Sequence, residues 1–234
     1  MIIAEQKTLN DVIKMLEGHR NVLVVGCRSC VAVCLAGGEK EAQILAESLL
    51  LHSELMGKGW NVEQITLERA CEKEWVREMG SAMEGRDAVI SLACGVGTQV
   101  IHELHPGVLI VPGVNTVSMG APEEQGIYVE KCGGCGDCVL HLTGGVCPVA
   151  RCSKSLMNGP CGGSQNGKCE IDPDTPCGWD LIYRSLKEQG RLDLMEVVIP
   201  PKNWKPSRSG GPRKTVRKEA VQTDEERTLR GACP

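Results

Sequence analysis

The stretch "NVLVVGCRSCVAVC", residues 21–34, carries the first information about the fold. Its apolar run at 21–25 is typical of a buried β-strand. The residues that follow, where a strand should lead into a helix, contain Cys27, Cys30 and Cys34. Three thiols in this position could form a disulfide, bind zinc, act as a reactive nucleophile or hold an iron–sulfur cluster.

Apolar runs of strand length alternate with segments of helical periodicity over the first 120 residues. Strands are predicted at 21–25, 61–67, 87–92 and 108–111, and helices at 8–18, 38–55, 73–83 and 98–104. Strands separated by helices form parallel sheets with right-handed crossovers. The sequence therefore predicts an α/β domain over residues 1–122, with a Rossmann-like or flavodoxin-like parallel sheet.

Composition narrows the class of protein further. A net charge of −4 gives no basic footprint for nucleic acid. The N-terminal residues lack the pattern of a signal peptide, and no apolar run reaches the roughly 18 residues of a membrane span. We therefore expect a soluble, cytoplasmic protein. Since thiols in a reducing compartment more often bind metal or carry redox chemistry, the 14 cysteines favour metal sites over disulfides.

Cysteines also follow the second and third predicted strands. Cys71 comes shortly after the strand at 61–67, and Cys94 follows the strand at 87–92. Ligands collect beyond the carboxyl ends of parallel strands, so these thiols should meet those after the first strand. We predict a first [4Fe–4S] site formed by Cys27, Cys30, Cys34 and Cys94, with Cys71 in reserve. Zinc is the alternative, and Cys71 or Cys94 could instead be buried small apolar residues.

Eight more cysteines occupy a segment rich in glycine and proline. The spacing CxxCxxC at Cys132, Cys135 and Cys138 is that of ferredoxins, in which a more distant cysteine before proline is also a ligand; here that cysteine is Cys147. These four residues form the predicted second [4Fe–4S] site. The third set, which could hold a cluster or zinc, consists of Cys152, Cys161, Cys169 and Cys177.

The same segment has little apolar periodicity, so metal ligation should supply its folding energy. We predict a metal-stabilised, cysteine-rich domain over residues 123–200, which includes a helix at 179–189. Residues 201–234, dominated by Lys, Arg, Ser, Gly and Pro, are expected to form a disordered tail and a candidate docking arm. Cys233 in this tail is expected to be an idle exposed thiol.

The motifs T-G-G-x-C-P at 143–148 and N-G-P-C-G-G at 158–163 carry a resemblance. With "GCRSCVAVCLAGGEKEA", "LACGVG" and "VPGVNTVSMG", they make residues 1–203 similar to MetV-type proteins, the small subunits of methylenetetrahydrofolate reductases. The resemblance implies a role in one-carbon metabolism, as in the Wood–Ljungdahl pathway, and a MetF-type partner whose flavin (FMN) reduces 5,10-methylenetetrahydrofolate.

By this resemblance, the chain would pass electrons from ferredoxin or another redox subunit to the flavin of its partner through one to three clusters. No catalytic residue is assigned to this chain. A second hypothesis is a zinc-stabilised module that positions or activates a partner enzyme without moving electrons. An independent enzyme is the third and weakest hypothesis, since no phosphate loop or nucleophile–base constellation is recognisable.

Overall fold

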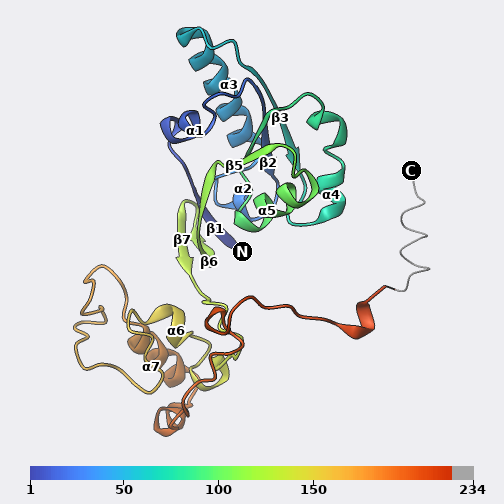
Figure 1. Ribbon diagram of the computed structural model, residues 1–234. Coiled ribbons are helices and arrows are strands. Elements are labelled where there is room, and N and C mark those ends of the chain that lie inside the picture. The colour runs from blue at the N-terminus through green and yellow to red at the C-terminus, as the bar shows by residue number, and fades with distance from the viewer. Residues whose placement is uncertain (223–234) are drawn as a thin grey trace.

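Four parallel strands form the larger sheet of the computed structural model, which describes residues 1–222 (Figure 1). They are β2 (Asn21–Cys27), β3 (Asn61–Leu67), β4 (Ala88–Ser91) and β5 (Leu109–Pro112), in the order β3-β2-β4-β5. All are parallel, which confirms the predicted parallel sheet. Every residue of β4 is buried, as expected for a central strand with both faces covered.

One helix before β2 and the helices between the four strands accompany this sheet. They are α1 (Leu9–Met15), α3 (Glu39–Met56), α4 (Lys73–Arg77) and α5 (Gly95–Leu104). α3 packs against β2 and β3, whereas α5 packs against β5 and α4. The helix predicted at 73–83 is divided into α4 and a 3₁₀ turn, η1 (Gly80–Met83). A single helical turn, α2 (Cys30–Val33), was not predicted.

The strand order reverses direction at the centre of the parallel sheet. The chain runs from β2 outward to β3, then returns past β2 to form β4 on its other side. The connection after β2 leads to one side of the sheet and the connection after β4 leads to the other. Two neighbouring strands with this arrangement define a topological switch point, where ligands bind in open α/β sheets. The carboxyl ends of β2 and β4 lie at this point. The comparison of this sheet with Rossmann or flavodoxin folds stays a prediction.

A second, antiparallel sheet was not predicted. It consists of β1 (Ile2–Gln6), β6 (Val114–Glu124) and β7 (Ile127–Glu130), in the order β1-β6-β7. In Figure 1 it lies between the parallel sheet and the cysteine-rich part. A Cβ at Gly120 would lie only 2.0 Å from the carbonyl oxygen of Val129, so glycine is required for the two strands to pair there. The hairpin β6–β7 spans the expected boundary at 122.

The cysteine-rich part contains few regular elements. They are η2 (Leu140–Leu142), α6 (Pro148–Arg151), α7 (Gly178–Glu188) and η3 (Leu192–Glu196). α7 confirms the helix predicted at 179–189. Its core is small and centres on Trp179, Ile182 and Leu186, whereas the parallel sheet contains the large apolar core. Nothing in this part tests the predicted stabilisation by metal.

Residues 199–213, which we call the C-terminal strap, contact the cysteine-rich part. At its start, the side chain of Asn158 donates to the carbonyl oxygen of Ile199 and accepts from its amide. Within the strap, η4 (Arg208–Gly210) is a 3₁₀ turn, and η5 (Lys218–Ala220) follows it. These residues fall in the range expected to be a disordered tail. Cys233 lies outside the described residues.

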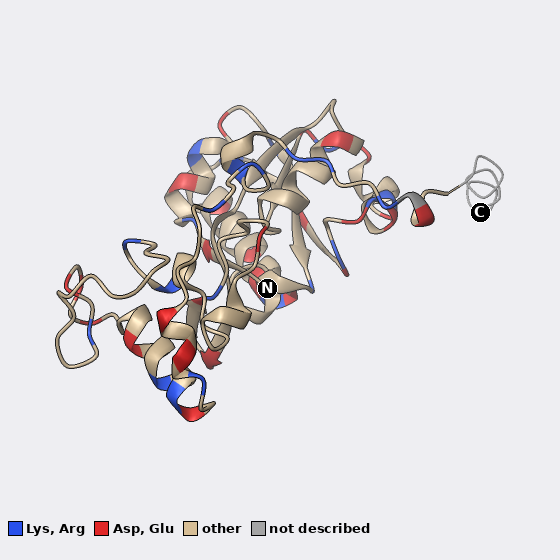
Figure 2. Cartoon of the chain, turned by 90° about the horizontal axis from the view of Figure 1, so that it is seen from below, with Lys and Arg blue, Asp and Glu red and all other residues tan. Residues whose placement is uncertain are grey.

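Basic and acidic residues are interspersed along the helices (Figure 2). Among the described residues, no helix combines the length and the apolar character needed to cross a membrane.

Candidate metal centres

Cys27, Cys71 and Cys94 lie after the carboxyl ends of β2, β3 and β4, at one edge of the parallel sheet. Cys27 ends β2, and Cys94 is the N-cap of α5, which follows β4. The Cys71 residue is exposed overall, yet desolvation of its thiol is the largest cause that raises its pKa, and the nearby charges of Cys94 and Cys27 raise it further. The charges of Cys94 and Cys27 therefore act on Cys71 at this edge.

The approach of Cys71 to Cys94 depends on a glycine in the first turn of α5. A Cβ at Gly97 would lie 2.8 Å from the Cβ of Ala93 and 2.9 Å from the Cβ of Ala70. Such distances do not occur between real side chains, so only glycine lets α5 lie directly against the segment that carries Cys71.

Cys30 and Cys34 have different surroundings. The sulfur of Cys34 is buried, accepts a hydrogen bond from the amide of Ala4 in β1 at 3.4 Å, and contacts the carbonyl oxygen of Val31 at 3.6 Å. Cys30 lines a mostly apolar pocket that also contains Cys132 of the second set. The first and second sets are therefore neighbours, joined through the hairpin β6–β7.

The CxxCxxC loop has hydrogen bonds of the kind that suit thiolates. The amide of Gly134 donates to the sulfur of Cys132 at 3.4 Å, and the amide of Cys132 is held by the carbonyl oxygen of Met119 in β6. Cys147 is the N-cap of α6, and Val149 in that helix lies beside the loop at Gly133. The structure thus places α6, which begins after the fourth predicted ligand, next to the loop with the other three.

The third set surrounds one small cavity. All four predicted cysteines line it, together with Trp179 and the ion pair Lys154–Glu170; they are Cys152, Cys161, Cys169 and Cys177. The hydroxyl of Ser153 lies 3.3 Å from the sulfur of Cys169, and this hydrogen bond is the largest cause that lowers the pKa of that thiol.

A glycine again explains why two of these cysteines approach. A Cβ at Gly178 would lie 2.5 Å from the carbonyl oxygen of Arg151 and 2.9 Å from the amide nitrogen of Cys152. Glycine at the start of α7 therefore lets the end of α6 lie against it. Cys177, directly before this glycine, comes next to Cys152 as a result.

The cysteines share an edge, a pocket and a cavity, but they are not yet arranged around metal positions. Within residues 1–222, no three Cys, His, Asp or Glu side chains form a group that could hold a metal ion as they stand. None of the cysteines described there forms a disulfide. Thiolates are ligands of both [4Fe–4S] clusters and structural zinc, so the donor chemistry of all three sets fits either group.

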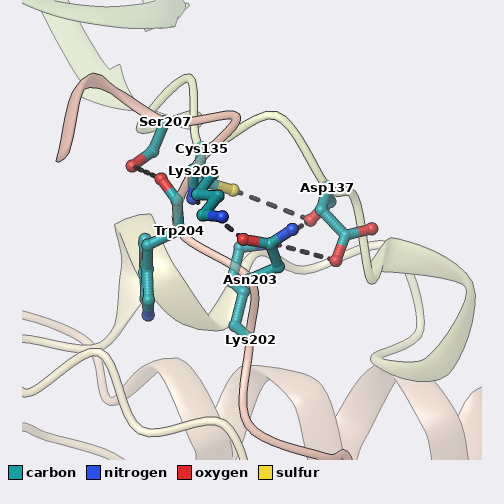
Figure 3. Close-up of polar contacts among 7 residues, drawn as sticks. All are labelled: Cys135, Asp137, Lys202, Asn203, Trp204, Lys205 and Ser207. Atoms are coloured by element: carbon teal, nitrogen blue, oxygen red, sulfur yellow. Dashed lines mark hydrogen bonds and ion pairs between the residues drawn. The ribbon is translucent and has the colours of Figure 1, made fainter. Parts of the chain in front are cut away.

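Two cations beside the cysteines were missed by the sequence analysis. The pKa of Arg69 is raised chiefly by its hydrogen bond with Glu72, and the thiolates of Cys71 and Cys27 also raise it. Lys202 in the strap contacts the CxxCxxC loop through Asp137 (Figure 3). Lysine and arginine are common on protein surfaces, so nothing in the sequence indicates that Arg69 and Lys202 lie beside cysteines.

These features define a class: a protein with a parallel α/β sheet, thiols at its carboxyl edge, and a separate cysteine-rich part. Residues 111–205, which begin in β5 and end within the strap, match the family described as Methylene-tetrahydrofolate reductase C terminal. The match covers less than half of the chain, and it confirms at family level the resemblance found in the sequence. A search of curated proteins and a search of solved structures gave no match.

Proposed function

We propose that this chain is an iron–sulfur electron-transfer subunit of a methylenetetrahydrofolate reductase complex. The observation that carries the proposal is the position of Cys27, Cys71 and Cys94 after the carboxyl ends of three parallel strands, beside the switch point of the sheet. This edge is where α/β proteins bind ligands, and a cluster of thiols there suits a cofactor better than a structural role. The family match of residues 111–205 supplies the association with the reductase.

Cys30 is the fourth ligand that we propose for the first site. Its thiol makes no hydrogen bond within the described residues, whereas the sulfur of Cys34 is engaged by β1 and buried. This set replaces Cys34 with the reserve residue Cys71. The guanidinium of Arg69 beside Cys71 and Cys27 would offset part of the negative charge that four thiolates bring.

Two further four-cysteine sets extend from the sheet into the family-matched segment. We propose that the set beginning at Cys132 holds a second cluster and that the set beginning at Cys152 holds a cluster or zinc. A [4Fe–4S] cluster, when bound, takes up and passes on single electrons. The residues of this chain hold it, shield it and tune its potential, while the substrate is reduced at the flavin of a MetF-type partner subunit. Ferredoxin or another redox protein is the proposed donor.

The first test is metal content and spectroscopy of the full chain purified without oxygen. We expect iron and acid-labile sulfide in near-equal amounts, and EPR signals of reduced [4Fe–4S] clusters after dithionite treatment. Iron at the level of contamination, after anaerobic reconstitution with iron and sulfide, would remove the basis of the proposal.

Matched variants test the ligand set of the first site. Cys71→Ala should lose the iron of one cluster, because Cys71 lies at the same sheet edge as Cys27 and Cys94 and is one of the four proposed ligands. Cys34→Ala should keep that iron, since in the proposed set Cys34 is not a ligand but a small buried side chain held against β1. Cys233→Ala, outside all three sets, controls for the loss of any one thiol. Retention in Cys71→Ala with loss in Cys34→Ala would instead support the original set.

A zinc-stabilised module that positions the partner is the second candidate function. It is favoured by the small core around Trp179, Ile182 and Leu186, which leaves much of the cysteine-rich part without apolar support. The same metal measurement separates the two functions. Zinc without acid-labile sulfide would support the module, and iron with sulfide would support electron transfer.

A further inference from the structure

The side chain of Lys202 is buried against the CxxCxxC loop. It is only 3% exposed, and its ammonium group donates to the main-chain carbonyl oxygen of Asp137 and lies 3.5 Å from a carboxylate oxygen of the same residue. It also lies 5.7 Å from the centre of the Trp204 ring. Asp137 stands between the second and third cysteines of the loop. A buried lysine next to a set of thiols requires an explanation, because burial of an ammonium group is costly.

One carbonyl oxygen connects this ammonium group to a sulfur. The thiol of Cys135 contacts the carbonyl oxygen of Asp137 at 3.7 Å, and Lys202 donates to the same oxygen (Figure 3). When Cys135 is a thiolate ligand, its hydrogen is lost and the sulfur faces a carbonyl oxygen that also carries partial negative charge. The ammonium group of Lys202 offsets both.

The strap is held close to the loop at several further points. Gly136 has φ +82°, and a Cβ there would lie 2.5 Å from the Cβ of Pro206. The guanidinium of Arg213 donates to the carbonyl oxygen of Gly134 at 3.1 Å and to that of Pro206 at 2.6 Å. The position of Lys202 is therefore fixed by contacts on both sides of it, rather than by its own ion pair alone.

We propose that Lys202 is a positioning residue that offsets the negative charge of the second four-cysteine site and raises its reduction potential. The inference rests on the proposed function, since it assumes a cluster at this site. Reduction adds one negative charge to a cluster that is already anionic. A nearby buried cation stabilises the reduced form more than the oxidised form. The carboxylate of Asp137 is 61% exposed and is therefore screened by water more than the ammonium group.

The experiment is a redox titration of the full chain followed by EPR. The signal of the second site is identified as the one that disappears in Cys135→Ala. We expect Lys202→Met to make reduction at this site about tenfold less favourable, which is a shift of about 59 mV toward negative potential for one electron. Asp137→Asn should shift the potential in the opposite direction, because it removes the anion that partly neutralises the lysine.

Two variants control for effects other than charge. Lys205→Met removes an exposed cation from the same strap and should leave the potential unchanged (Figure 3). Lys202→Arg retains the charge and should retain the potential. If Lys202→Met loses the iron of this site while Lys202→Arg keeps both the iron and the potential, the site requires the positive charge at position 202 and the proposal is supported. If both lose the iron, the role is one of shape and the proposal is wrong.

The inference and the proposed function fail in different ways. Absence of a cluster from the wild-type chain would refute the proposed function. A wild-type cluster at the second site whose potential is the same in Lys202→Met would refute only the role of the lysine.

Discussion

Replacement of Gly97 by alanine should weaken both the fold and the first metal site. Gly97 lies in the first turn of α5, where an added Cβ would meet the Cβ atoms of Ala93 and Ala70 at 2.8 and 2.9 Å. These neighbours are short side chains close to the backbone and cannot turn aside. α5 must therefore move away from the segment at 70–71, and Cys94 must move away from Cys71.

The expected loss of stability follows from two opposing contributions. Overpacking of a well-packed region costs about 1–3 kcal/mol. Alanine in a helix is favoured over glycine by up to about 1 kcal/mol, and the gain is smaller near a helix end. We therefore expect a net loss of roughly 1–2 kcal/mol in the free energy of unfolding. For a chain of this size, each kcal/mol corresponds to about 2–4 °C in the melting temperature.

Gly95 provides a matched control in the same helix. A Cβ there would meet only the hydroxyl oxygen of Thr116, at 3.5 Å, which is ordinary van der Waals contact. Urea unfolding followed by far-UV circular dichroism, with iron measured on the same samples, should show a loss of stability and iron in Gly97→Ala and neither in Gly95→Ala. Equal stability and equal iron in the two variants would refute the packing argument.

Three further changes have defined outcomes. Cys135→Ala should unfold the cysteine-rich part and leave the parallel sheet folded, and limited proteolysis with mass spectrometry would reveal this. Loss of all secondary structure would contradict the idea that metal ligation stabilises one part and the aliphatic core stabilises the other. Gly178→Ala should reduce metal bound by the third set, since its Cβ would meet the backbone of Arg151, and metal analysis under anaerobic conditions checks this. Partial burial alone would raise the pKa of Asp87, but hydrogen bonds from the amides of Arg20 and Asn21 leave it below its ordinary value. The stability that comes from this lowered pKa is present above the ordinary aspartate pKa and is lost as pH falls through the pKa of the folded state. Asp87→Asn should therefore have a lower urea midpoint than wild type at neutral pH, and the difference should narrow in acid. A difference that does not change with pH would show that the charge of Asp87 is not involved.

The parallel sheet could be predicted because its signals are local. Each strand is a short run of β-branched and aliphatic residues, and "NVLVVGC" became β2 over its whole length. The antiparallel sheet could not be predicted in this way. β6 pairs with β1 from the far end of the domain, contains glycine and proline, and buries few residues along its length. Its formation depends on backbone pairing between distant segments, which leaves no periodic pattern.

The same distinction applies to the candidate sites. That Cys27, Cys71 and Cys94 would converge follows from the rule that parallel strands end at one edge, so sequence alone suggested it. The direction of Cys34 depends on β1, which was not foreseen, and its thiol is turned to that strand instead. The proposed role of Lys202 depends on a hydrogen bond from its ammonium group to the main-chain carbonyl oxygen of Asp137. Every residue has such a carbonyl oxygen, so the sequence does not indicate which one Lys202 contacts.

The arrangement separates the aliphatic core of the parallel sheet from the cysteine-rich part, which we propose to depend on metal. The parallel sheet is stable through its aliphatic core, and β6 pairs with β1 beside it by backbone hydrogen bonds. Because Met119 in β6 holds the amide of Cys132, the start of the second set is fixed by the sheet rather than by its own ligands. Cys30 and Cys132 line one pocket, next to Met119 and Gly120 of β6. Electron transfer depends steeply on distance, so under the proposed function the hairpin β6–β7 is the element that sets the separation of the first two sites.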